Sequence, residues 1–73
     1  MTREEIFRVV EEDTSIPPEI LGALSRDKDN GVRRRVALNY STPPEILLIL
    51  MVDDNEYVRQ KAEATLSKRV MRP

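Results

Sequence analysis

The chain has 73 residues, a net charge of -1 and no cysteine or histidine. This composition excludes disulfides, zinc sites built from cysteine and histidine, thiol chemistry and acid–base catalysis by imidazole. Charged residues make up 34% of the chain and hydrophobic residues 40%, a balance typical of one small folded helical domain rather than of a disordered segment. We therefore expect a single domain, residues 1–73, with no metal and no cofactor.

The sequence predicts neither secretion nor a membrane span. Its start lacks the apolar stretch of a signal peptide, and its longest apolar run, Ile46 to Val52, has seven residues. Together with the lack of cysteine, this favours a cytoplasmic location without membrane contact.

Charge is unevenly distributed along the chain. Residues 1–31 carry eight acidic and four basic side chains, a net of -4, whereas residues 32–73 carry five acidic and eight basic side chains, a net of +3. The two ends should therefore differ in electrostatic potential, and head-to-tail association is one consequence.

The first predicted helix covers residues 3–12. Thr2 and Glu5 form a capping box at its start, in which the hydroxyl and the carboxylate each satisfy a backbone amide. Its apolar stripe has helical spacing and consists of Ile6, Val9 and Val10.

The second and fourth predicted helices, residues 17–25 and 43–51, each begin with two prolines, which fit a first helical turn because they have no amide to satisfy. Thr42 should cap the fourth helix and form a second capping box with Glu45. Three side chains of the second helix are expected to be buried: Ile20, Leu21 and Leu24.

The third and fifth predicted helices cover residues 30–38 and 56–69. Asp29 and Asn55 precede them and are the expected N-caps. Six apolar side chains of these helices are expected to face inward: Val32, Val36, Ala37, Val58, Ala62 and Leu66.

One segment of the chain occurs twice. Residues 17–21, Pro-Pro-Glu-Ile-Leu, return as residues 43–47, and the residues that follow also match at this offset of 26. A fixed period of this length predicts stacked helical repeats. The first helix matches the second half of a repeat, so the chain holds about two and a half repeats, close to the minimum of about three that such a stack normally needs.

This pattern resembles the HEAT-like helical repeats. Its short period and the Thr-Pro-Pro-Glu sequence of residues 42–45 are most similar to the leucine-rich repeat variant branch. The resemblance covers residues 15–66 and implies an all-α, right-handed α-α superhelix of five helices. Some leucine-rich repeat variant proteins carry an iron–sulfur cluster on cysteines; this chain has none, so that property does not carry over.

The resemblance also implies a structural role for four residues. In HEAT-like families a turn aspartate and an arginine of the following helix form a ladder of contacts between adjacent repeats. The matching residues are Asp27, Arg33, Asp53 and Arg59. A guanidinium suits this role because it can bond a carboxylate and helix-end carbonyls together.

The outer side of the fourth helix is unexpectedly apolar. Where the second helix has Gly22, Ala23, Ser25 and Arg26, the fourth has Leu48, Ile49, Met51 and Val52. An exposed apolar patch of this kind marks contact with another chain, so these four residues predict a protein-interaction module, with a second copy of the chain as the favoured partner. The alternative is that the fifth helix or the C-terminal tail covers them.

Nucleic-acid binding is the second hypothesis. Arg34, Arg35 and Lys61 could form a basic stripe along the second helices of the repeats. Aromatic residues for base stacking are scarce, however, because the chain has one Phe, two Tyr and no Trp. We expect no enzymatic activity, since serine and threonine have no histidine partner and the acidic side chains of the first helix are typical of a solvated face.

Overall fold

The computed structural model describes residues 2–70, of which residue 70 is described by its backbone alone. These residues fold into five α-helices without a β-strand, which confirms the all-α prediction. The helices are α1 Arg3–Glu12, α2 Pro18–Leu24, α3 Asn30–Leu38, α4 Pro44–Leu50 and α5 Glu56–Val70. Pro17 and Pro43 are extended N-caps rather than helical residues, so α2 and α4 begin one residue later than predicted.

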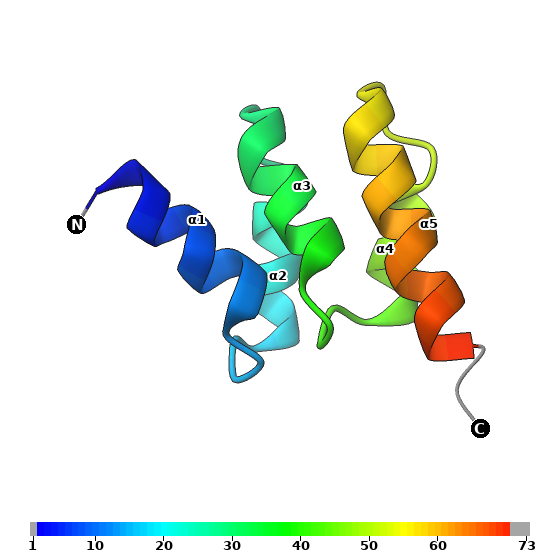
Figure 1. Ribbon diagram of the computed structural model, residues 1–73, viewed down its shortest axis with the longest axis horizontal. Helices are drawn as coiled ribbons and strands as arrows, with labels where there is room; N and C mark the ends of the chain where they lie inside the picture. Colours follow the sequence, from blue (N-terminus) through cyan, green and yellow to red (C-terminus); the bar gives the residue numbers. More distant parts are fainter. Residues whose placement is uncertain (1, 71–73) are drawn as a thin grey trace.

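The helices lie in two layers (Figure 1). α1, α3 and α5 stand in a row, and the central helix α3 contacts both neighbours. α2 and α4 lie behind this row, with α2 packed on α3 and α4 packed on α5. The chain therefore alternates between the front and the back layer from one end of the molecule to the other.

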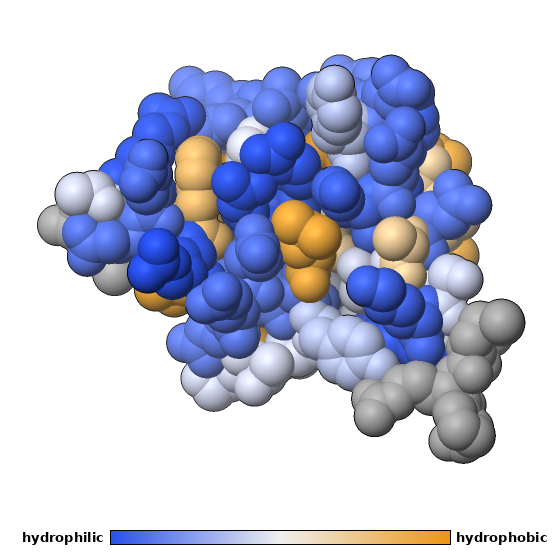
Figure 2. Space-filling model, viewed as in Figure 1, coloured by the Kyte–Doolittle hydropathy of each residue, from blue (hydrophilic) through white to orange (hydrophobic). Residues whose placement is uncertain are grey.

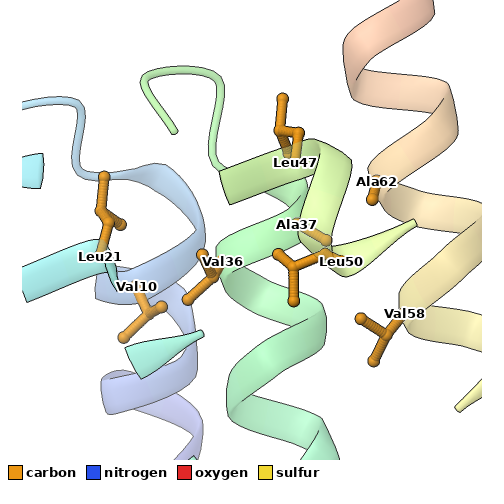
Figure 3. Packing of buried hydrophobic residues seen from close by; sticks show 8 residues of the cluster. All are labelled: Val10, Leu21, Val36, Ala37, Leu47, Leu50, Val58 and Ala62. Atoms are coloured by element: carbon orange, nitrogen blue, oxygen red, sulfur yellow. The ribbon is translucent and has the colours of Figure 1, made fainter. Parts of the chain in front are cut away.

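The core lies between the two layers and receives side chains from all five helices (Figure 3). Leu21 and Leu47, which match at the repeat offset, are both fully buried. The complete set of buried apolar residues is Val10, Leu21, Val36, Ala37, Leu47, Leu50, Val58 and Ala62. Each short back-layer helix is thus held by the leucines that point into this core.

Three of the predicted helix caps are confirmed. Thr2 and Glu5 form the capping box of α1, with both amide-to-side-chain distances at 3.2 Å. The Asp29 carboxylate accepts the amide of Gly31 at 2.8 Å. The Asn55 side-chain oxygen accepts hydrogen bonds from the backbone amides of Tyr57 and Val58 in the first turn of α5, at 2.9 and 3.2 Å. These polar side chains fix where the front-layer helices begin.

The predicted capping role of Thr42 is wrong. Pro43 is the N-cap of α4, and no side chain caps that helix. Thr42 is instead fully buried, and its hydroxyl donates to the carbonyl oxygen of Val36 at 2.7 Å. The hydroxyl therefore ties the last turn of α3 to the loop that leads into α4, and Glu45 stays exposed to solvent.

The predicted burial of Ile20 is also wrong, because its side chain is 50% exposed. The equivalent Ile46 is covered by α2, where a methyl group at Gly22 would lie 3.7 Å from the Ile46 Cδ1. Within the described residues no helix of the back layer precedes α2, so Ile20 has nothing on that side to cover it. The same position is thus half-buried at Ile46 and exposed at Ile20.

Candidate functional site

The outward side of α4 exposes three large apolar side chains. Leu48 is 55% exposed, Ile49 62% and Val52, just beyond the helix, 81%. We call these three residues the α4 surface. Leu47 and Leu50 are buried and fix the side of α4 that faces the core. Because successive side chains of a helix are 100° apart, the three residues of the α4 surface then lie on the side that faces solvent.

Met51 differs from the prediction that it belongs to this surface. It is half-buried and packs against the core. The reason is its spacing, since Met51 follows the buried Leu47 by four residues and therefore lies on the same side of the helix.

The fifth helix does not cover the α4 surface. α5 packs against α4 through the core, where Val58 and Ala62 are buried together with Leu47 and Leu50. The remaining alternative, a C-terminal tail folded over α4, concerns residues 71–73 and lies outside the described part of the chain. Figure 2 shows that the opposite face, formed by α1, α3 and α5, is largely hydrophilic.

Arg33 connects the two interhelical turns. Its guanidinium donates to both carboxylate oxygens of Asp53, at 2.9 and 3.2 Å, and to the carbonyl oxygen of Asp27 at 2.7 Å. The Arg33 and Asp53 side chains are only 13% and 11% exposed. Asp54 also accepts from Arg33, at 3.2 Å, but its side chain is 92% exposed.

This arrangement shifts two pKa values. Burial alone would raise the pKa of Asp53, but the hydrogen bonds from Arg33 and the Asn55 amide, together with the Arg33 charge, outweigh burial and hold it below its usual value. The hydrogen bond to Asp53 raises the pKa of Arg33. The pair is therefore ionised at neutral pH.

The other two residues of the expected ladder make fewer contacts. Arg59 donates to the carbonyl oxygen of Asp53 at 2.6 Å, and no carboxylate of residues 2–70 pairs with it. The Asp27 carboxylate accepts the amide of Asp29 at 2.8 Å. Position 7, which matches Arg33 at the repeat offset, holds Phe7, so Asp27 lacks the arginine that Asp53 has.

The basic residues of the second hypothesis are not all free for a ligand. Arg35 pairs with Glu11 at 3.3 Å and stacks over the Phe7 ring at 5.0 Å. The Arg34 Nε is buried and has no hydrogen-bond partner, and Lys61 on α5 is half-buried. The structure therefore places acidic and aromatic groups among the cations that the basic stripe would need.

No group that would hold a metal is present among residues 2–70. A shallow hollow of about 210 Å³ lies on α1 and α3 and is lined by Glu4, Phe7, Arg8, Glu11, Glu12 and Arg35. Its mixed charges show no pattern of a catalytic or cofactor site. None of the helices between residues 2 and 70 is long and apolar enough to cross a membrane.

Sequence reasoning missed the polar side chains that connect neighbouring helices of the front layer. The buried Asn39 donates to the carbonyl oxygens of Val10 and Asp13 at 2.8 and 2.9 Å, and the buried Thr65 donates to that of Ala37 at 2.6 Å. Positions 13, 39 and 65 match at the repeat offset, which was the available signal. Their side chains differ, however, so the match was not visible as a motif.

Comparisons of the sequence and structure with protein-family models, with curated proteins and with solved structures found no match.

Proposed function

We propose that this protein is a non-catalytic protein-interaction module that works in the cytoplasm and associates with itself through the α4 surface. The observation that carries the proposal is the exposure of Leu48, Ile49 and Val52 side by side. Contiguous apolar side chains on a small soluble domain cost free energy in water and are typical of surfaces that a partner covers.

The scaffold proposed for this surface is a short right-handed superhelix of HEAT-like repeats of the leucine-rich repeat variant type. Recurrence of one turn contact supports it. Arg33 donates to the carbonyl oxygen of Asp27, and Arg59 donates to that of Asp53, so in each case the donor follows the acceptor at a sequence separation of six. Repeat stacks of this kind serve as binding scaffolds, and their ends are the natural sites of further stacking.

The size of the surface sets the expected affinity. Fully burying a Val, Leu or Ile side chain stabilises by about 1.5–3 kcal/mol, so covering what these three still expose contributes roughly 3–6 kcal/mol. Association costs about 4–15 kcal/mol of lost freedom, so the partner must add apolar contacts of its own. We therefore expect a dissociation constant of about 1 μM or weaker.

The test is the mass in solution, measured by light scattering over a concentration series. Wild type should grow in mass with concentration, and Leu48→Glu/Val52→Glu should stay monomeric with unchanged helical circular dichroism. The matched control is Gln60→Glu/Ala64→Glu on α5, which adds two charges at the same spacing on an exposed side and should associate like wild type. Unfolding of the Leu48/Val52 variant would mean that these residues belong to the core.

Nucleic-acid binding through Arg34, Arg35 and Lys61 is the weaker proposal, because Arg35 is already held by Glu11 and Phe7.

A further inference from the structure

A second set of exposed apolar side chains lies at the end of the molecule formed by α1 and α2. Ile6 is 43% exposed, Val9 41% and Ile20 50%. α1 is the first helix of the front layer and α2 is the first of the back layer, so neither has a preceding helix in its layer among residues 2–70 (Figure 1). We call these three residues the N-terminal face.

The repeat offset shows which side of α1 lacks a neighbour. Val9 matches Arg35, which reaches Glu11 of the preceding front-layer helix at 3.3 Å. Asp13, four residues after Val9, matches Asn39, whose side chain donates to two carbonyl oxygens at the end of that same helix. Val9 and Asp13 therefore lie on the side of α1 that corresponds to the side on which α3 meets its preceding front-layer helix.

Asp13 makes this side unsuited to the helix contact found inside the chain. Asn39 and Thr65, which match it, each donate a hydrogen bond to a carbonyl oxygen of the preceding front-layer helix. An ionised carboxylate can only accept hydrogen bonds, and hydrogen bonds from the Ser15 hydroxyl and amide hold the pKa of Asp13 below its usual value. A helix that packs here must therefore bring a donor of its own, such as a lysine or arginine side chain.

The charges around the N-terminal face are mainly negative. Residues 2–25, which include α1 and α2, carry six acidic and two basic side chains, a net of -4. Four of the acidic side chains are exposed, lie close to the face in the sequence and form no ion pair with any of residues 2–70: Glu5, Glu12, Asp13 and Glu19. Arg3 pairs with Asp29, so in this segment Arg8 alone is left to balance these four charges. A partner of positive charge is therefore favoured.

A second copy of the chain does not offer such a partner helix. α4, which exposes apolar side chains, has no lysine or arginine between Pro44 and Leu50. α3 and α5 carry three and four basic side chains, but apolar residues that could form a stripe beside them, such as Val36 and Ala62, are buried in the core. The complementary helix therefore belongs to a different protein.

We propose that the N-terminal face binds an amphipathic helix of another protein, in which a stripe of apolar side chains is flanked by lysine or arginine. The apolar stripe covers Ile6, Val9 and Ile20, and the basic side chains meet Asp13 and the flanking glutamates. This inference goes beyond the proposed function, because it concerns a different face and a different partner.

The probe is a synthetic peptide of about 18 residues, long enough to form a helix alone, with a stripe of leucines at helical spacing and lysines beside it. The control peptide keeps the leucines and has glutamate in place of lysine. Fluorescence anisotropy of the labelled peptides should show that the lysine peptide binds wild type, and that the glutamate peptide binds at least about tenfold more weakly because its charges meet like charges. Equal binding of the two peptides, or no binding of the lysine peptide, overturns the proposal.

Charge variants of the protein locate the contact. Glu12→Gln/Glu19→Gln removes two charges beside the N-terminal face and should weaken binding of the lysine peptide several-fold. The matched control, Glu45→Gln/Glu63→Gln, removes two exposed charges elsewhere and should bind like wild type. The difference should shrink in about 1 M salt, where the Debye length falls to about 3 Å. An equal effect of the two variants at low salt overturns the proposal.

Neutral variants distinguish the N-terminal face from the α4 surface. Val9→Ser/Ile20→Ser should weaken binding of the lysine peptide several-fold with unchanged helical circular dichroism, and Leu48→Ser/Val52→Ser should bind it like wild type; if the first variant unfolds, the charge variants decide alone. Loss of binding by the Leu48/Val52 variant only would place the peptide on the α4 surface and overturn the proposal. Self-association is measured by light scattering without peptide, so the proposed function stands or fails separately.

Discussion

At the scale of single residues, buried polar side chains connect neighbouring helices of the front layer. Asn39 is fully buried and bonds two carbonyl oxygens at the end of α1. Its own side-chain oxygen accepts the amide and the hydroxyl of Ser41, at 2.8 and 2.7 Å. Every hydrogen-bonding atom of this amide group is therefore used, and any replacement leaves buried groups without partners.

We predict that Asn39→Ala lowers the free energy of unfolding by about 3 kcal/mol, because two helix-end carbonyls lose a buried donor. Asp13→Ala is the matched control. Asp13 occupies the equivalent position and makes the same local turn, with Ser15 amide and hydroxyl at 2.8 and 2.5 Å, but lies exposed and holds no second helix. Urea unfolding should show a much smaller loss for Asp13→Ala; equal losses would mean that the turn alone matters.

The Arg33–Asp53 pair predicts a pH dependence of stability. Because the folded state lowers the pKa of Asp53, the pair stabilises the fold above the unfolded pKa of about 3.9, and this contribution is lost as the pH falls through the lower folded value. Asp53→Asn should therefore cost about 2 kcal/mol at pH 7 and progressively less below about pH 4.

The control for this prediction is Asp54→Asn. Asp54 also contacts Arg33, but its side chain is almost fully exposed, so solvent screens the pair. Denaturant unfolding at pH 7 and at pH values down to about 3 should show little difference between Asp54→Asn and wild type. A constant gap between Asp53→Asn and wild type across this range would contradict the assignment.

At the scale of helices, the two glycines sit in different surroundings. A methyl group at Gly22 in α2 would lie at an ordinary 3.7 Å from Ile46, whereas at Gly31 in α3 it would lie 3.0 Å from the Asp29 Oδ1 and 3.1 Å from the Phe7 ring. Neither glycine has a positive φ, so both could accept alanine as far as the backbone is concerned. The two positions therefore differ in the room that each leaves for a methyl group.

We predict that Gly22→Ala raises the free energy of unfolding by about 0.5–1 kcal/mol, because alanine loses less backbone entropy in a helix. Gly31→Ala should gain less or lose stability, since the Phe7 ring and the cap of α3 must move. Thermal unfolding of both variants tests this, and an equal gain at the two sites would contradict the packing at Gly31.

The sequence predicts where the helices lie in the chain better than it predicts which neighbours cover or bond their side chains. Helical spacing and the proline, aspartate and asparagine starts located all five helices, because these signals are local. Thr42 could not be assigned from its motif, since a threonine before two prolines can either cap a helix or bond a neighbouring one. Ile20 was expected in the core because its pattern equals that of Ile46, and a pattern records which side is apolar but not whether a neighbour covers it.

At the scale of the whole molecule, both ends expose apolar side chains: Ile6, Val9 and Ile20 at one end, and Leu48, Ile49 and Val52 at the other. Among residues 2–70 the back layer consists of α2 and α4, so each of these helices has a back-layer neighbour on one side only. A two-layer arrangement this short therefore leaves a large share of its apolar side chains at its ends, and a partner that covers them would add to a stability that is small for a domain of this size.

Glu19 and Glu45 give a test of where copies meet, because they match at the repeat offset, are both exposed and precede Ile20 and Ile46. If copies associate through the α4 surface, Glu45→Lys removes one of the acidic charges beside that surface and should strengthen association several-fold, while Glu19→Lys on α2 should leave it unchanged. Both variants change the net charge equally, so a general charge effect cannot separate them. The difference should shrink in about 1 M salt, where the Debye length falls to about 3 Å. Light scattering at low and high salt measures both effects; an equal effect of the two variants would indicate that another surface makes the contact.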